Sequence, residues 1–314
     1  MADLTFHPDG ITAVDAHYVR PQLDAVHIIV QRGRAAFVDT GTTQSVPHLL
    51  AALEQLGVAR SAVDYVFLTH VHLDHAGGAG VLMRALPNAR AVLHPRAAPH
   101  MQDPSALETA SIAVYGEATY RRLYGEILPI DAQRIVVTQD GQHLDLAGRR
   151  FEFVHTPGHA MHHQAIVDLD TASIFSGDTF GMSYREFDVE GRAMIVPTTT
   201  PTQFDPEQLT ASIDRLLSYR PVAIYLTHYS RITDCERLGA NLKQQVRQFA
   251  QIARKHAHSP DCRLQIRAAM RELWIALAHA HGVATPAEAV DRLLAADLDL
   301  NTDGLLAWLS RRKR

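Results

Sequence analysis

The sequence is short of cysteine and has no long apolar run. Only two of its 314 residues are cysteine, Cys235 and Cys262, which argues against a disulfide framework and indicates a reducing compartment. No stretch approaches the roughly 20 apolar residues that a membrane-spanning helix needs. The N-terminal residues MADLTFHPDG show no basic stretch before an apolar core, so a secretory signal is not expected. We therefore expect a cytoplasmic protein.

An excess of positive charge is also absent. The formal net charge is −4 and charged residues make up 20% of the chain, as in an ordinary globular protein. This mild acidity gives no general attraction for nucleic acid or anionic lipid. The expected partner is therefore a small-molecule substrate, with no membrane and no nucleic acid, and a homodimer is left open.

The chain is rich in histidine, with 19 in 314 residues, and several gather in one loop. A predicted strand at residues 63–68 is followed by THVHLDHAGG, which contains His70, His72, Asp74 and His75. Because His70 and His72 are two residues apart, an extended backbone points both imidazoles the same way. Asp74 and His75 follow where the chain turns towards a helix, so they can reach a different point. Four ligands within six residues predict a metal site.

Three further candidate ligands follow later predicted strands. His159 lies in TPGH after residues 151–155, Asp178 in SGDT after residues 173–175, and His228 in LTHY after residues 222–226. Loops held by a rigid sheet often carry functional residues, and these three share that context with the first loop. Neutral imidazoles and carboxylates suit zinc, iron or manganese, and the absence of a cysteine ligand argues against a structural zinc site.

The pattern of apolar residues predicts an α/β core followed by a helical appendage. The domains are expected at residues 1–232 and 233–314. Predicted strands are residues 11–18, 26–31, 35–39, 63–68, 91–94, 134–138, 151–155, 164–168, 173–175 and 222–226, with a hairpin turn at Arg32-Gly33. Predicted helices are residues 47–56, 80–86, 206–219, 237–256, 261–281, 286–295 and 303–311, and residues 96–128 form a helix-like insertion.

The series HVHLDH, TPGH, SGDT and LTHY, in that order, resembles the metallo-β-lactamase superfamily. Within it, the series is similar to the binuclear branch of glyoxalase II-type thioesterases, lactonases and RNase Z-type nucleases. The resemblance spans residues from about 11 to 232 and implies an αββα sandwich with the site at one edge, between two sheets. It implies two divalent metal ions, with zinc favoured and iron or manganese as alternatives. The implied ligands are His70, His72 and His159 for the first metal, Asp74, His75 and His228 for the second, and Asp178 as the bridge.

Two metals roughly 3.5–4 Å apart can share a hydroxide, because coordination lowers the pKa of water to about 7. That hydroxide would attack an electrophilic carbonyl, and Asp74 would orient it as the catalytic residue. We expect a hydrolase of a small ester, thioester or lactone. The alternatives are a phosphodiesterase or nuclease, an iron-dependent oxidoreductase, and a metal-binding sensor without catalysis. Asp39, which recurs in the superfamily as a buried carboxylate, is interpreted as support for the metal loop.

Overall fold

The structure is a computed structural model that describes residues 2–199 and 202–312. Their contacts divide them into two compact units, each described here by itself. Unit 1 comprises residues 2–155, 162–177 and 221–231, and unit 2 comprises residues 156–161, 178–199, 202–220 and 232–312. The sequence-based expectation of two domains, with a boundary after residue 232, stays a prediction.

Unit 1 contains a seven-stranded sheet whose strands lie in chain order. The first four strands pair antiparallel, and the pairs from β4 to β7 are parallel. Arg32 and Gly33 form the hairpin turn between β3 and β4 with positive φ angles of 48° and 78°, as the sequence predicts. The strands are β1 Leu4–Phe6, β2 Ile11–Asp15, β3 Ala25–Gln31, β4 Arg34–Val38, β5 Val63–Phe67, β6 Arg90–Leu93 and β7 Ile135–Val137.

A second, six-stranded sheet has the order β13-β12-β11-β10-β9-β8. Strands β8 to β11 pair antiparallel, whereas β11 and β12 pair parallel. The parallel pair requires a long crossover, since β11 and β12 are separated by almost fifty residues of chain. The strands are β8 Gln142–Leu146, β9 Arg149–His155, β10 Gln164–Asp168, β11 Ser173–Phe175, β12 Ala223–Leu226 and β13 Ser230–Ile232.

The two sheets face each other across an aromatic core. Phe67 of the first sheet packs against Phe151 and Phe153 of the second, with ring centroids 5.4 and 5.1 Å apart. Successive side chains of a strand point to opposite faces, so Ala36 and Val38 enter this core while Phe37 points the other way. Both faces of β4 are therefore buried, which explains its continuous apolar run.

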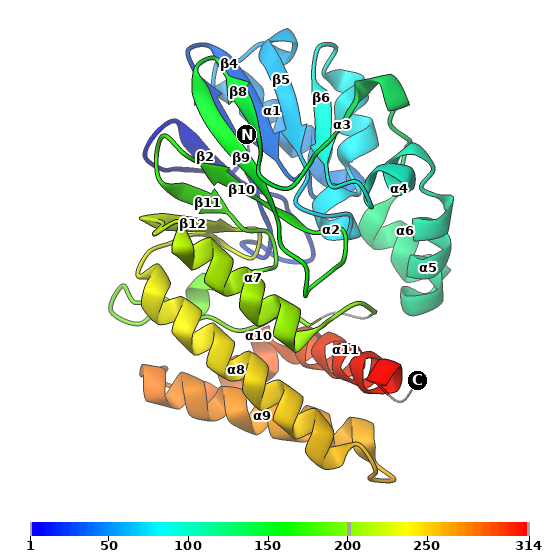
Figure 1. The fold of residues 1–314 in the computed structure, drawn as a ribbon, viewed down its shortest axis with the longest axis vertical. Coiled ribbons are helices and arrows are strands. Elements are labelled where there is room, and N and C mark those ends of the chain that lie inside the picture. Colours follow the sequence, from blue (N-terminus) through cyan, green and yellow to red (C-terminus); the bar gives the residue numbers. More distant parts are fainter. Residues whose placement is uncertain (1, 200–201, 313–314) are drawn as a thin grey trace. The chain divides into compact units, whose positions relative to one another are not determined.

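Helices α1 and α3 cover the outer face of the seven-stranded sheet (Figure 1). Leu49 and Leu53 of α1 and Leu82 of α3 form one buried cluster with Phe37 and Val66 of the sheet. The helices of unit 1 are α1 Val46–Gln55, α2 Leu73–Ala76, α3 Ala79–Ala85, α4 Ala98–Gln102, α5 Ser105–Tyr115 and α6 Glu117–Tyr124, with 3₁₀ turns η1 Thr43–Ser45, η2 Arg60–Ala62 and η3 Ala132–Arg134.

Unit 2 is helical, and its helices pack around Trp274, which is fully buried against Phe249 with ring centroids 5.7 Å apart. In Figure 1 the long helices α8 and α9 lie side by side, and α7 packs along α8. The helices are α7 Pro206–Ser218, α8 Cys235–His256, α9 Cys262–His281, α10 Pro286–Leu293 and α11 Ala295–Arg312, with the 3₁₀ turn η4 Arg185–Phe187. Among the described residues, no helix combines the length and the apolar character that crossing a membrane requires.

Several elements differ from the sequence prediction. The strand expected at residues 11–18 ends at Asp15, because the Asp15 carboxylate accepts hydrogen bonds from the backbone N–H groups of His17 and Gln22 and closes a turn. Helix α11 begins at Ala295 and not at residue 303. Strands β1, β8 and β13 were not predicted, since each is short and two of them are partly exposed.

Candidate metal centre

The histidine-rich loop of unit 1 leaves β5 beside a buried carboxylate. Asp39 follows β4 directly, and its oxygens accept hydrogen bonds from the backbone N–H of Thr69 at 2.8 Å and from the Thr69 hydroxyl at 2.9 Å. Asp39 also accepts from Nδ1 of His75 at 2.8 Å and from the hydroxyl of Thr227 at 3.1 Å. One carboxylate thus joins the ends of β4, β5 and β12, as expected for a residue that supports the metal loop.

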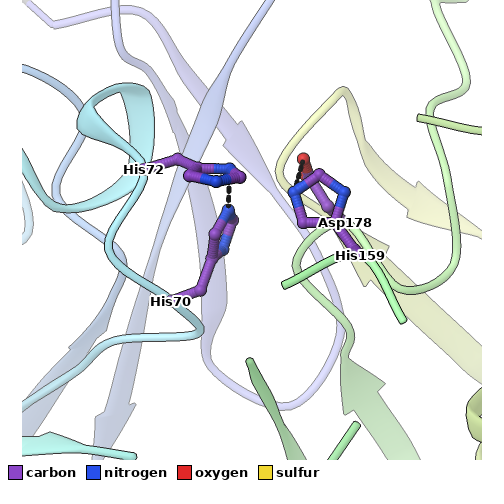
Figure 2. A group of neighbouring side chains, drawn as sticks. All are labelled: His70, His72, His159 and Asp178. Carbon is purple, nitrogen blue, oxygen red and sulfur yellow. Dashed lines mark hydrogen bonds and ion pairs between the residues drawn. The ribbon is translucent and has the colours of Figure 1, made fainter. Parts of the chain in front are cut away.

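His70 and His72 converge on each other, as their spacing of two residues predicts. Nε2 of His70 lies 2.8 Å from Nδ1 of His72 (Figure 2). The ring of His163 packs against that of His70 with centroids 4.8 Å apart. His70 is fully buried, so its imidazole is held in the protein interior and is not a solvated surface group.

A second group in unit 1 is formed by Asp74, His75 and His228. Their ligand atoms all lie within 4.8 Å of one another. Nε2 of His75 lies 3.9 Å and Nε2 of His228 lies 3.8 Å from Oδ2 of Asp74. His228 comes from the end of β12, more than 150 residues after Asp74, so the fold brings together residues that the sequence separates.

Both histidines of this group are oriented by buried carboxylates. Nδ1 of His75 donates to Asp39, and Nδ1 of His228 lies 2.7 Å from Oδ1 of Asp24. A proton held on Nδ1 places the lone pair of each neutral imidazole on Nε2, the atom that faces Asp74. Burial raises the pKa of Asp24 to about 6, and the neighbouring His228 opposes that rise.

Glycines let the chain pass close to this loop. A Cβ on Gly77 would lie 2.4 Å from the carbonyl oxygen of Leu73, and one on Gly78 would lie 2.6 Å from that of Thr42. Gly177 has a φ of +47°, and its Cβ would lie 2.7 Å from both Nε2 of His163 and the side chain of Thr69. Any larger residue at these positions would displace the loop.

The other two predicted ligands, His159 and Asp178, belong to unit 2. Nε2 of His159 lies 3.3 Å from Oδ2 of Asp178, so the structure brings these two residues together (Figure 2). His159 is 1% exposed and Asp178 is 3% exposed. Their assignment to the same metal centre as the five residues of unit 1 stays a prediction.

The residues of unit 1 fit a divalent metal ion. Buried imidazole nitrogens and one carboxylate converge, and second carboxylates hold the rings, as in protein sites for zinc and similar metals. Sequence reasoning missed Asp24, which is fully buried at the start of β3. The one signal was an acidic residue directly before an apolar strand, and that signal alone does not separate a buried carboxylate from a turn residue.

Comparison with known proteins identifies the family of the chain. The sequence model of the metallo-beta-lactamase superfamily matches residues 24–228. The metallo-beta-lactamase fold-containing protein ST1585 of Sulfurisphaera tokodaii is 24% identical over 224 residues, which is 70% of this chain and 78% of the relative. A hydroxyacylglutathione hydrolase of Xanthomonas euvesicatoria pv. vesicatoria is 30% identical over 186 residues, which is 59% of this chain and 54% of the relative.

Among solved structures, the metallo-beta-lactamase family protein TTHA1429 of Thermus thermophilus matches with a TM-score of 0.67 and 20% identity. The match covers 97% of this chain and 94% of that protein. A likeness at this identity concerns the fold, and it extends over the C-terminal helices as well as the two sheets. The fold expected from the sequence is therefore confirmed.

Proposed function

Because the chain belongs to the metallo-β-lactamase superfamily, we propose that it is a metal-dependent hydrolase that cleaves a small ester, thioester or lactone. The observation that carries the proposal is the group formed by Asp74, His75 and His228, whose ligand atoms lie within 4.8 Å of one another. The two imidazoles of this group are held by buried carboxylates, so the group is organised before any ligand arrives.

We assign seven ligands to two metal ions. His70, His72 and His159 hold the first ion, Asp74, His75 and His228 hold the second, and Asp178 bridges them. Chain connectivity supports the assignment of the two residues of unit 2 as ligands. His159 follows the last residue of β9 by four positions, and Asp178 follows the last residue of β11 by three. Short tethers to strands of unit 1 limit how far either side chain can lie from the ends of those strands.

The chemistry follows from the donor set. Two divalent ions, most simply zinc, would supply when bound an ionised water near neutral pH and a Lewis acid for the substrate oxygen. Asp74 is the catalytic residue on the protein side, because its side chain is 24% exposed while its partners His75 and His228 are buried. Its carboxylate can accept a proton from the attacking water and orient that water towards the substrate carbonyl.

The relatives support acyl chemistry. Hydroxyacylglutathione hydrolases, by their name, cleave a thioester of glutathione, and one is 30% identical to this chain. The alignment covers about half the length of that relative, so its substrate is not assigned to this chain. The net charge of −4 favours a small acyl compound over a nucleic acid. The cytoplasmic location also stays a prediction.

An activity assay with a matched variant tests the proposal. Protein stripped of metal and reloaded with zinc, manganese or iron should cleave members of a panel of aryl esters, thioesters and lactones. His228→Ala should lower kcat/KM by at least a hundredfold, and His143→Ala, at a surface position on β8, should leave it unchanged. Inactivity of the metal-loaded protein on every acyl substrate, with turnover of bis(p-nitrophenyl) phosphate in its place, would overturn the proposal.

A further inference from the structure

The loop that carries His228 is held by the beginning of β3, about 200 residues earlier in the chain. The backbone N–H of Ala25 donates to the carbonyl of Thr227 at 2.7 Å. Tyr229 packs with Ala13 and Ala25 in one buried apolar cluster. Nε2 of His27 lies 3.3 Å from the hydroxyl of Ser230. The position of His228 is therefore set by the segment around Ala25, and not only by β12.

Asp24 adds a direct contact to His228 itself. It is 0% exposed, and its Oδ1 lies 2.7 Å from Nδ1 of His228. Its Oδ2 is buried and has no hydrogen-bond partner among the described residues. A buried carboxylate with one strong partner depends on that partner to remain in place, and the partner depends on it in turn.

The contrast with Asp39 makes the role of Asp24 specific. Asp39 accepts hydrogen bonds from Thr69, His75 and Thr227, so it holds three strand ends as well as one imidazole. The side chain of Asp24 holds no strand end in this way, because its other oxygen makes no hydrogen bond among the described residues. Loss of the Asp24 carboxylate should therefore act on His228 and leave the strand ends in place.

We propose that Asp24 is a positioning residue that holds His228 in the orientation and tautomer required for the metal site with Asp74 and His75. The inference rests on the proposed function only in assuming that this group binds metal. Asp24 fixes a proton on Nδ1 of His228 and so directs the lone pair of Nε2 towards Asp74, which lies 3.8 Å away. Without the carboxylate, the contact of Nδ1 with the carbonyl of Leu23 is long, at 3.4 Å, and the imidazole can more readily carry its proton on Nε2.

Metal binding by a set of variants tests this role. Wild type, Asp24→Asn, Asp24→Leu, His228→Ala and the double variant Asp24→Leu/His228→Ala would be titrated with zinc against a chelating dye, and their zinc content measured. Asp24→Leu should weaken the second site by roughly 10- to 100-fold, as carboxylates behind ligands usually do. Asp24→Asn should weaken it less, because an amide oxygen still accepts from Nδ1. The double variant should bind zinc no more weakly than His228→Ala.

A readout without metal separates positioning from general structure. In the metal-free wild type, the two-bond ¹H–¹⁵N spectrum of His228 should show the Nδ1-protonated tautomer, and Asp24→Leu should shift it towards the Nε2-protonated form. Unchanged zinc affinity and an unchanged tautomer in a folded Asp24→Leu protein would overturn the inference, as would further loss in the double variant. Wild type that binds zinc but cleaves no acyl substrate would refute the proposed function and leave this inference standing.

Discussion

The carboxylate of Asp39 lies 2.8 Å from Nδ1 of His75, and both side chains are buried. The pair links the end of β4 to the metal loop that follows β5. Thr69 and Thr227 donate to the same carboxylate, so the loop and the end of β12 share one anchor. Ligands from distant parts of the chain can therefore keep fixed positions without a metal ion.

Asp39→Asn should destabilise the protein more than a comparable change at a partly exposed carboxylate. An amide has one acceptor oxygen and adds two donors, so at least one of the groups on Thr69, His75 and Thr227 loses its partner. The expected loss in the free energy of unfolding is about 1–3 kcal/mol, measured by denaturant titration of metal-free protein. Asp64→Asn, at a residue paired with Arg34, is the control. An equal effect of both changes would contradict the anchoring role.

Gly177→Ala should disturb the metal loop, whereas Gly33→Ala should not. Both glycines have positive φ, so the backbone strain of alanine is similar, but nothing lies within 4 Å of the position of a Cβ on Gly33. At Gly177 the Cβ would meet His163 and Thr69 at 2.7 Å. We expect an additional loss of roughly 1–3 kcal/mol at Gly177 and reduced zinc uptake. Equal unfolding free energies for the two variants would show that the close approach does not matter.

Stability should fall as the pH drops below about 6.5, in part because of His27. Burial, with the neighbouring His7, lowers the pKa of His27 to about 3 in the folded protein. The unfolded chain takes up a proton near pH 6.5 that the folded protein excludes, so unfolding becomes easier by about 1.4 kcal/mol per pH unit for this group. That contribution to stability is present above pH 6.5 and is lost as the pH falls towards 3.

His27→Leu should remove the contribution of His27 to the pH dependence of stability. Denaturant titrations between pH 4 and pH 7 measure the free energy of unfolding of both proteins, and the slope against pH should be smaller in the variant. His7 also reaches the Ser230 hydroxyl, so that group keeps a partner when His27 is replaced. A slope identical to that of wild type would show that folding does not lower the pKa of His27.

Asn301→Ala should destabilise unit 2. Asn301 is 1% exposed, and its side-chain oxygen accepts from the backbone N–H and the hydroxyl of Thr199 at 2.5 and 2.7 Å. Removal leaves the backbone N–H of Thr199 without its acceptor, which should lower the free energy of unfolding by about 1–3 kcal/mol. The Thr199 hydroxyl still has the backbone carbonyl of residue 301 as an acceptor, at 3.1 Å. Thermal unfolding compares it with Asn88→Ala, at an exposed turn. A melting temperature no lower than that of the control would be inconsistent with the role of Asn301.

Asn301 also explains a failure of sequence-based prediction. The sequence predicts a helix that begins at residue 303, within Asn-Thr-Asp-Gly, whereas α11 begins at Ala295 and continues through all four residues. A contact with Thr199, about 100 residues away, satisfies the asparagine and makes the helix compatible with it. Local propensity cannot reveal such a long-range contact.

The metal loop was more predictable because its signal is local. His70, His72, Asp74 and His75 stand within six residues, and His228 follows a continuous apolar strand, so spacing and strand ends alone indicated these five. Asp24 could not be found in the same way, since its role depends on a pairing with His228 that only the folded chain creates. Sequence patterns do not reveal three short strands for a similar reason, since pairing with neighbours defines them more than their own residues do. These strands are β1, β8 and β13.

The most direct test of the central claim is anomalous diffraction at the zinc edge from crystals of the zinc-loaded protein. The account predicts two anomalous peaks roughly 3.5–4 Å apart. One should lie about 2.0–2.1 Å from Nε2 of both His75 and His228, with Asp74 also coordinated. Crystals of folded protein that show no anomalous peak between Asp74, His75 and His228 would contradict the account.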